Sequence, residues 1–226
     1  MAAITALTQL YPPPSDPSRH DWDEAEQSVG LCLPDDYKQV ADLYGRGEFN
    51  NFITLYQPGG HEEYSLTGPM PRRLREQIKQ IWQADPYAEP LPCNVENLLA
   101  TGVTGNGDYI FWITDPVEDP DSWKITVNHA MRGGWFTFEG KISEFILAVL
   151  QGSAQVPMFP RTLPTAGPVF SPAPPERGPS VRVSTEGATT SPKEIRAWAR
   201  ANGYELQDRG RIPPEIVRAW EQRGDG

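Results

Sequence analysis

Apolar side chains recur every three or four residues over much of the first half of the chain. This spacing predicts helices over residues 21–29, 33–44 and 74–82, because it places the apolar side chains on one face of a helix. The buried side of the third helix would hold Leu74, Ile78, Ile81 and Trp82. Its outer side would hold four basic residues: Arg72, Arg73, Arg75 and Lys79.

The pattern then changes to the alternation and the short apolar runs that are typical of β-strands. Strands are predicted over residues 52–56, 98–100, 108–114, 123–128 and 135–138. Asn106-Gly107 marks a hairpin turn between two of them, and residues 143–150 return to helical spacing. Helices first, strands in the middle and one helix last is an α+β order rather than a repeating βαβ order.

The first twenty residues are ambiguous. Ile4, Leu7 and Leu10 would lie on one face of a short helix. A run of prolines from Pro12 would end that helix, because proline lacks the backbone donor. We expect the domain proper to begin near His20.

The composition changes again after Gly152, where prolines become frequent and large apolar residues scarce. Such a segment buries too little apolar surface to offset the entropy lost on ordering, and proline keeps it extended. We therefore predict three parts: a first domain over residues 1–152, a disordered but semi-rigid proline-rich linker over 153–189, and a small second domain over 190–226.

Two short helical patterns make up the predicted second domain, over residues 191–203 and 213–223. Ser191 has a glutamate three residues later, which is a capping-box arrangement at a helix start. The inner face of the first helix would include Trp198 and Ala199. The two helices would pack around one tryptophan each and form a two-helix module with an exposed connecting loop.

Charge is divided unevenly between the two predicted domains. The chain has a net charge of −10. Residues 1–150 hold 10 Lys and Arg against 22 Asp and Glu, whereas residues 190–226 hold 7 against 6. The acidic part would repel nucleic acid, so any contact with DNA is expected to come from the C-terminal part.

The cysteines and the ends of the chain predict where the protein is found. Cys32 and Cys93 do not make a disulfide framework, which is typical of a reducing, intracellular compartment. The N-terminus lacks a signal-peptide pattern, and no stretch has the length of a membrane span. We expect a cytoplasmic protein with no membrane partner.

No catalytic or metal-binding pattern is evident. His20, His61 and His129 are isolated, and no Cys/His spacing suits zinc. The acidic stretch 115–121 lacks the spacing of a calcium loop, and its two prolines favour a plain loop. Residues 105–108 lack the lysine of a phosphate-binding loop and are better interpreted as a turn. We expect no metal, no cofactor and no enzymatic activity.

Several short motifs follow one another in residues 20–152: Trp22-Asp23-Glu24-Ala25-Glu26, Leu33-Pro34-Asp35-Asp36-Tyr37, Tyr44-Gly45-Arg46-Gly47-Glu48-Phe49 and Gly107-Asp108-Tyr109-Ile110-Phe111-Trp112, with Phe145-Ile146 later. In this order and spacing they resemble the SUKH superfamily of the Smi/Knr type, which includes many bacterial immunity proteins. The resemblance implies an α+β domain with a twisted, mostly antiparallel sheet packed by helices. It also implies binding of another protein, often a toxin, rather than catalysis.

The second domain carries a more specific resemblance. It contains Ser191-Pro192-Lys193-Glu194-Ile195-Arg196-Ala197-Trp198-Ala199-Arg200-Ala201-Asn202-Gly203-Tyr204 and then Arg209-Gly210-Arg211-Ile212-Pro213. This stretch is similar to the C-terminal DNA-binding domain of the actinobacterial Lsr silencers, which are histone-like nucleoid proteins. The resemblance implies that Arg209, Gly210 and Arg211 form a hook in the minor groove of A·T-rich DNA. The silencers carry a small oligomerisation domain where this chain has its SUKH-like domain.

The chemistry of these residues agrees with that role. Glycine has no Cβ, so its backbone can lie flat against a surface, and the A·T-rich minor groove is narrow, with an enhanced negative potential that attracts arginine. Three basic residues on the outer face of the first helix would neutralise phosphates: Lys193, Arg196 and Arg200. The plainer alternatives are a polar turn between two helices and a solvated helix face.

Taken together, the patterns predict a non-enzymatic, nucleoid-associated DNA-binding protein whose acidic SUKH-like domain binds a protein partner. The main alternative is an immunity protein that neutralises a nuclease-type toxin, because an acidic surface attracts a basic nuclease. A third interpretation is that the two-helix module binds a peptide. The oligomeric state stays open.

Overall fold

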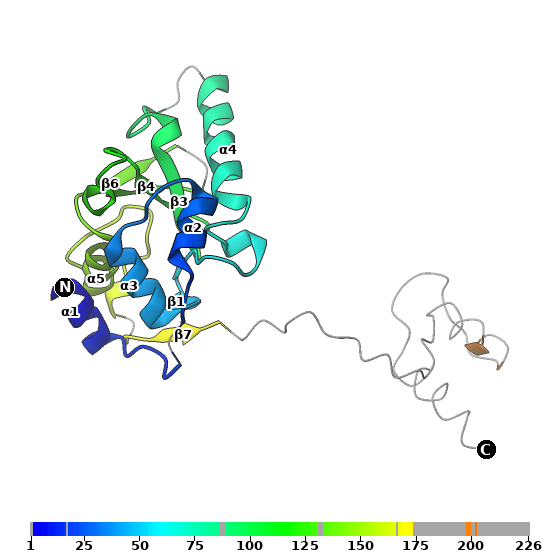
Figure 1. Ribbon diagram of the computed structural model, residues 1–226, viewed down its shortest axis with the longest axis vertical. Coiled ribbons are helices and arrows are strands. Elements are labelled where there is room, and N and C mark those ends of the chain that lie inside the picture. The colour runs from blue at the N-terminus through cyan, green and yellow to red at the C-terminus, as the bar shows by residue number, and fades with distance from the viewer. Residues whose placement is uncertain are drawn as a thin grey trace. The chain divides into compact units, whose positions relative to one another are not determined.

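The computed structural model describes residues 2–16, 18–85, 89–130, 133–165, 167–173, 198–199 and 202. The chain divides into two compact units, Met1–Glu176 and Arg177–Gly226. Nearly all described residues belong to the first unit, which is drawn in colour in Figure 1. The predicted two-helix module lies almost entirely outside the described residues.

A seven-stranded sheet forms the centre of the first unit, with the strand order β6-β5-β4-β3-β2-β1-β7. Every neighbouring pair of strands is antiparallel. The strands are β1 (Gly47–Phe49), β2 (Ile53–Leu55), β3 (Leu98–Thr104), β4 (Tyr109–Ile113), β5 (Lys124–Asn128), β6 (Trp135–Phe138) and β7 (Phe170–Pro172). The predicted α+β class with an antiparallel sheet is confirmed.

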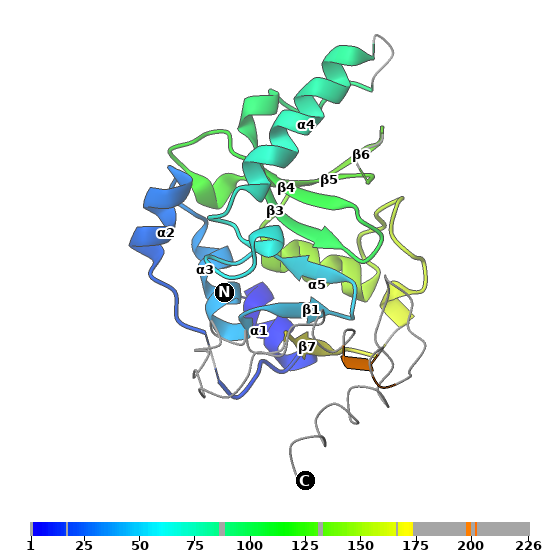
Figure 2. The same ribbon diagram turned by 90° about the vertical axis from the view of Figure 1, so that its right-hand side faces the viewer.

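Five α-helices among the described residues surround this sheet. They are α1 (Ala2–Leu10), α2 (Trp22–Val29), α3 (Asp35–Tyr44), α4 (Met70–Ala84) and α5 (Ile142–Gln151), with short 3-10 helices η1 (Glu62–Tyr64), η2 (Val95–Asn97), η3 (Pro120–Ser122) and η4 (Leu163–Thr165). Figure 2 shows α4 on one side of the sheet and α1 and α5 on the other. The predicted helices and strands between residues 21 and 150 are all present, and β1 is an additional strand.

Aromatic side chains join the sheet to the helices on the α5 side. Trp112 of β4 is 1% exposed and lies edge-on to Tyr37 of α3, with ring centroids 4.9 Å apart. Phe138 of β6 contacts Phe145 of α5 in the same manner at 5.6 Å. Alternate residues of a strand point to opposite faces, so Tyr109, an odd-numbered position of β4, points to the α4 side.

A buried carboxylate holds α3 against the start of α5. Asp36 is 6% exposed, and its two oxygens accept hydrogen bonds from the backbone N–H of Ser143 (2.8 Å) and from its hydroxyl (2.7 Å). A buried carboxylate needs such donors, because burial without them costs several kcal/mol. Asp36 lies in the first turn of α3. Its carboxylate also accepts a backbone N–H in the first turn of α5, which has no partner within that helix.

The first unit begins earlier than the predicted start near His20. Ile4 and Leu7 of α1 are buried, and Tyr11 is 3% exposed. The hydroxyl of Tyr44 donates a hydrogen bond to the carbonyl of Tyr11 at 2.6 Å, which joins the end of α3 to this N-terminal segment. Leu10, the third residue of the predicted apolar face, is exposed.

The predicted linker is wrong for its first part. Three apolar residues of this stretch are buried in the core: Val156, Phe159 and Leu163. The chain then continues as β7, which pairs with β1 at the edge of the sheet. The first unit therefore continues past the predicted boundary at residue 152. The remainder of the predicted linker, 174–189, lies outside the described residues.

A turn of two asparagines between β1 and β2 holds this segment in place. Asn50 and Asn51 have φ angles of 51° and 50°, a left-handed conformation that asparagine tolerates better than most residues. The Asn50 side chain accepts from the N–H of Val169 at 3.0 Å, and its backbone N–H donates to the Val169 carbonyl at 2.8 Å. The Ser171 hydroxyl donates a hydrogen bond to Oδ1 of Asn51 at 2.7 Å.

Candidate functional site

The residues predicted to contact DNA lie outside the described residues: Lys193, Arg196, Arg200, Arg209, Gly210 and Arg211. Trp198, Ala199 and Asn202 are the described part of the C-terminal unit. The N–H of Asn202 donates to the carbonyl of Trp198 at 3.0 Å, which is the spacing of a helical hydrogen bond. Ala199 is fully buried, as predicted for the inner face of this helix.

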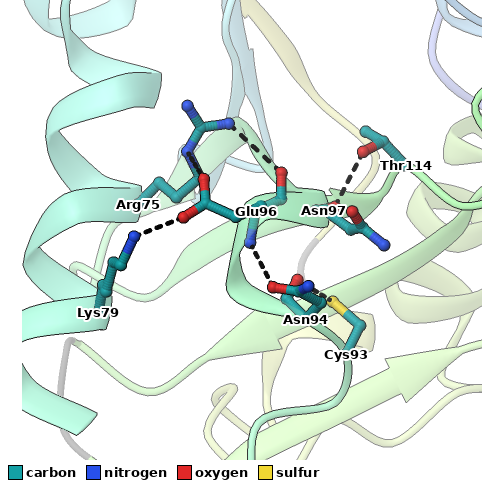
Figure 3. A network of polar contacts seen from close by, with 7 residues as sticks. All are labelled: Arg75, Lys79, Cys93, Asn94, Glu96, Asn97 and Thr114. Atoms are coloured by element: carbon teal, nitrogen blue, oxygen red, sulfur yellow. Dashed lines mark hydrogen bonds and ion pairs between the residues drawn. The ribbon is translucent and has the colours of Figure 1, made fainter. Parts of the chain in front are cut away.

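The four basic residues of α4 fall into two groups: two contact a carboxylate, and two are exposed and line an open cavity. Arg75 and Lys79 both contact Glu96 of η2, as Figure 3 shows. The Lys79 ammonium lies 2.6 Å from one carboxylate oxygen of Glu96, and Nε of Arg75 lies 3.8 Å from the other. Arg72 and Arg73 are exposed and form no ion pair with any described residue. They line an open cavity of about 680 Å³ beside the end of α2.

The Glu96 cluster fastens α4 to the start of β3. The Lys79 hydrogen bond holds the pKa of the Glu96 carboxyl below its ordinary value, and the carboxylate in turn raises the pKa of Lys79. The pair therefore stays ionised at neutral pH. It is lost as the pH falls through the lowered pKa of Glu96 or rises through the raised pKa of Lys79. On its other side Asn94 accepts the Glu96 backbone N–H at 3.1 Å. These contacts are structural and leave Glu96 without a free charge for a ligand.

The outer end of α4 differs from its predicted arrangement. Leu74 and Ile78 are buried as expected, but Ile81 and Trp82 are 42% and 46% exposed. Figure 1 shows the reason, because the last turns of α4 extend beyond the sheet. The helical pattern placed these side chains on the correct face of the helix, but the sheet does not reach far enough to cover them.

One row of residues crosses the whole sheet on the α4 side. Each member lies directly opposite the next on the neighbouring strand, so all the side chains point to the same face. In strand order from β7 to β6 the row is Ser171, Glu48, Thr54, Val103, Tyr109, Asn128 and Trp135. Most of these side chains are polar or aromatic and partly exposed. In the row beside it, Phe49 and Ile53 are buried and Phe170 is half-buried.

A cavity of about 430 Å³ lies over the middle of this row. Its floor includes Glu48, Thr54 and Tyr109, and its walls come from η1, the first residue of α4 and the β3–β4 turn. Tyr56 and Tyr64 also line it, with ring centroids 6.5 Å apart. No local motif in the sequence marks this site. The alternation of strand residues predicts which side chains share a face of one strand, but not that five separate segments meet.

The two cysteines of the first unit, Cys32 and Cys93, are free thiols. Burial, with a smaller contribution from Asp115, raises the pKa of the Cys93 thiol to about 11, so Cys93 is protonated and unreactive at neutral pH. No group of three or more His, Cys, Asp or Glu among the described residues could hold a metal ion. No described helix is long and apolar enough to cross a membrane.

A comparison with known families identifies the domain that these elements form. The SMI1-KNR4 cell-wall family matches residues 19–146, which is more than half of the chain. The chain belongs to the SMI1-KNR4 family. Within this SMI1-KNR4 region lie α2, α3, α4 and the strands β1 to β6, whereas α1 and the segment that ends in β7 lie outside the match. No solved structure matches the chain.

A second family model matches part of the C-terminal unit of this SMI1-KNR4 protein. Residues 187–222 match the Lsr2 DNA-binding domain. The match contains all six residues that were predicted to contact DNA: Lys193, Arg196, Arg200, Arg209, Gly210 and Arg211. The chain therefore combines a SMI1-KNR4 domain with a DNA-binding domain of the Lsr2 type, in the predicted order.

Proposed function

We propose that this protein is a non-enzymatic, nucleoid-associated DNA-binding protein that reads the minor groove of A·T-rich DNA. Arg209, Gly210 and Arg211 form the hook, and its two arginines reach along the groove in opposite directions. The observation that carries the proposal is the match of residues 187–222 to the Lsr2 DNA-binding domain, which includes this triplet.

Phosphate contacts would supply the remaining affinity. Lys193, Arg196 and Arg200 recur at helical spacing, so they lie on one face of the predicted helix and can face the DNA backbone. A single tail makes few such contacts, so the affinity of a monomer is modest and depends strongly on salt. Self-association would raise it by about 10²–10⁴ through avidity.

The charges of the two units support different functions for them, DNA binding by the second unit and protein binding by the first. Residues 1–173 hold 11 Lys and Arg against 22 Asp and Glu, a net charge of −11, whereas residues 174–226 hold 9 against 8. DNA is repelled by the first unit and contacted by the second. The SMI1-KNR4 domain is then free to bind a protein partner.

Gel shift with two duplexes of equal length, one A·T-rich and one G·C-rich, tests the minor-groove proposal. We expect the A·T-rich duplex to be retained at lower protein concentration, because its minor groove is narrower and more negative. We also expect the logarithm of the binding constant to fall linearly with the logarithm of the salt concentration, by about 0.9 per phosphate contacted. Equal retention of both duplexes at low salt would contradict minor-groove reading.

A second candidate function is immunity against a nuclease-type toxin, and the strongly acidic first unit favours it. Nucleases bind an anionic substrate through a basic surface, and opposite charges steer association. The test is a pull-down from cells that carry candidate toxins, with the full chain and with a chain that lacks residues 177–226. Immunity predicts a tight, stoichiometric toxin complex with both chains. A complex that needs the C-terminal unit, or no toxin complex at all, speaks against it.

A further inference from the structure

Tyr56 has a polar group that no described residue satisfies. Its side chain is 1% exposed, and its hydroxyl forms no hydrogen bond with any described residue. Tyr56 lines the 430 Å³ cavity together with Tyr64, Tyr109 and Glu63. Burial raises the pKa of the Tyr56 hydroxyl, and the nearby Tyr109, Tyr64 and Glu63 raise it further. With no described partner, the hydroxyl of this cavity-lining residue is available to a ligand.

Two carboxylates line the same cavity without a lysine or arginine to neutralise them. Glu48 is exposed and forms no ion pair with a described residue. Glu63 lies beside the exposed His61 imidazole, whose Nδ1 is 3.9 Å from a carboxylate oxygen. Among the described residues that line the cavity, none is Lys or Arg. The cavity is therefore negatively charged and lies in a unit that is itself strongly acidic.

Tyrosine rings complete the lining. Tyr56 and Tyr64 are edge-on to each other, with an interplanar angle of 70°, and Tyr64 remains 44% exposed. Tyr109 lies on the floor beside them. The face of an aromatic ring attracts a cation by about 0.5–2 kcal/mol. Rings and carboxylates in one cavity thus favour the same kind of ligand.

We infer that this cavity binds an arginine side chain from a basic segment of a protein partner. A guanidinium carries five N–H donors and no acceptor, which suits two carboxylates and a tyrosine hydroxyl. Its flat face can also stack on a tyrosine ring, unlike the compact ammonium of lysine. The inference rests on the proposed function in one respect, that the SMI1-KNR4 domain binds a protein, and it adds the surface and the chemistry of that contact.

The experiment titrates the full-length protein with the capped tripeptide acetyl-Gly-Arg-Gly-amide and follows the tyrosine and glutamate signals by NMR. The matched probe is the same peptide with citrulline, which has nearly the same shape but no charge. We expect saturable binding of the arginine peptide at millimolar concentration and at least about tenfold weaker binding of the citrulline peptide. Absence of binding at millimolar concentration, or equal binding of both peptides, would overturn the assignment.

Variants locate the site. The double substitution Glu48→Gln with Glu63→Gln is expected to weaken binding of the arginine peptide by at least about tenfold, because it removes both anionic partners. The matched control is Glu62→Gln with Glu118→Gln, which makes the same change in net charge at exposed residues outside the cavity lining. We expect this control to bind within about twofold of the original protein. If both double variants weaken peptide binding equally, general charge attraction holds the peptide, and the assignment is overturned.

Removal of the hydroxyl alone provides a finer readout. Tyr56→Phe keeps the ring and its packing, so the protein remains folded, and we expect it to weaken arginine binding severalfold. If Tyr56→Phe binds as tightly as the original protein, the hydroxyl is not a partner and the proposed set of contacts is wrong. Unfolding curves of all variants exclude a loss of structure.

Gel shift with the same variants separates this inference from the proposed function. We expect the Glu48→Gln, Glu63→Gln protein to retain the A·T-rich duplex as the original protein does, because the cavity belongs to the first unit. Loss of peptide binding with DNA binding intact confirms that the two sites are distinct. An original protein that binds DNA but not the arginine peptide overturns only the cavity assignment. One that binds the peptide but not DNA overturns only the DNA-binding proposal.

Discussion

Replacing Arg209 and Arg211 together by alanine is expected to abolish the preference for A·T-rich DNA. Each guanidinium would lie in the most negative part of the minor groove, where loss of one specific contact costs about 1–3 kcal/mol. The double variant should therefore bind the A·T-rich duplex at least about thirtyfold more weakly. Gel shift at low salt measures the loss, and circular dichroism of the same sample shows whether the helices persist.

The control for this prediction is a second pair of arginines in the same unit. Arg218→Ala with Arg223→Ala makes an equal change in net charge, in the predicted second helix rather than in the hook. We expect this pair to weaken both duplexes by a similar, smaller factor through loss of general attraction to DNA. If the two doubles lose A·T-rich DNA equally while remaining helical, charge alone holds the DNA and the hook is not a specific reader.

Phe159→Ala is expected to destabilise the first unit by about 3–5 kcal/mol. Phe159 is 8% exposed and packs edge-on against Phe52 at 5.1 Å and against Phe145 of α5 at 6.4 Å. Truncation would leave a cavity between the sheet and α5, since neither neighbouring ring can move to fill it without losing its own contacts. Urea unfolding, followed by tryptophan fluorescence, gives the free energy of unfolding directly.

Val169→Ala is the matched control, because Val169 lies in the same segment but is 50% exposed. We expect it to change the free energy of unfolding by no more than about 0.5 kcal/mol, as exposed substitutions usually do. Its backbone hydrogen bonds with Asn50 do not involve the side chain and would remain. If Phe159→Ala is as mild as this control, residues 153–173 are a tether and not part of the folded unit.

Local pattern was sufficient for most of the SMI1-KNR4 domain. The residues of β6, Trp135–Phe138, coincide with the predicted strand, and α5 extends by only one residue at each end beyond its prediction. In these segments the neighbours that determine the conformation are close in the sequence, so the period of apolar residues is visible within a short window. The same holds for the acidic and basic division of the chain, which is a property of composition.

The segment after α5 shows where local pattern fails. Frequent prolines and scarce apolar residues predict a linker, because proline removes hydrogen-bond donors. Three of the apolar residues that remain are nonetheless enough to anchor the chain: Val156, Phe159 and Leu163 are all buried. Phe52, which packs against Phe159, and the Asn50 turn, which binds Val169, lie more than 100 residues earlier. No window of sequence contains both sides of such a contact.

The 430 Å³ cavity proposed to bind arginine depends on the same kind of long-range arrangement. Glu48, Thr54 and Tyr109 become neighbours through strand pairing, and Tyr64 is added from a short helix that follows β2. Each of these residues, taken alone, is an ordinary strand or loop residue. Antiparallel pairing in one register places them on one face, and a shift by one residue would have turned them into the core.

The amino-acid sequence by itself determined the α+β class, the acidic first unit and the Arg209-Gly210-Arg211 triplet, because periodicity, composition and short motifs are all local properties. Only the tertiary structure decided that α1 and β7 complete the first unit and that Tyr56 and Glu48 share a cavity with Glu63. The physical reason is that burial and strand register are set by contacts between residues far apart in the chain.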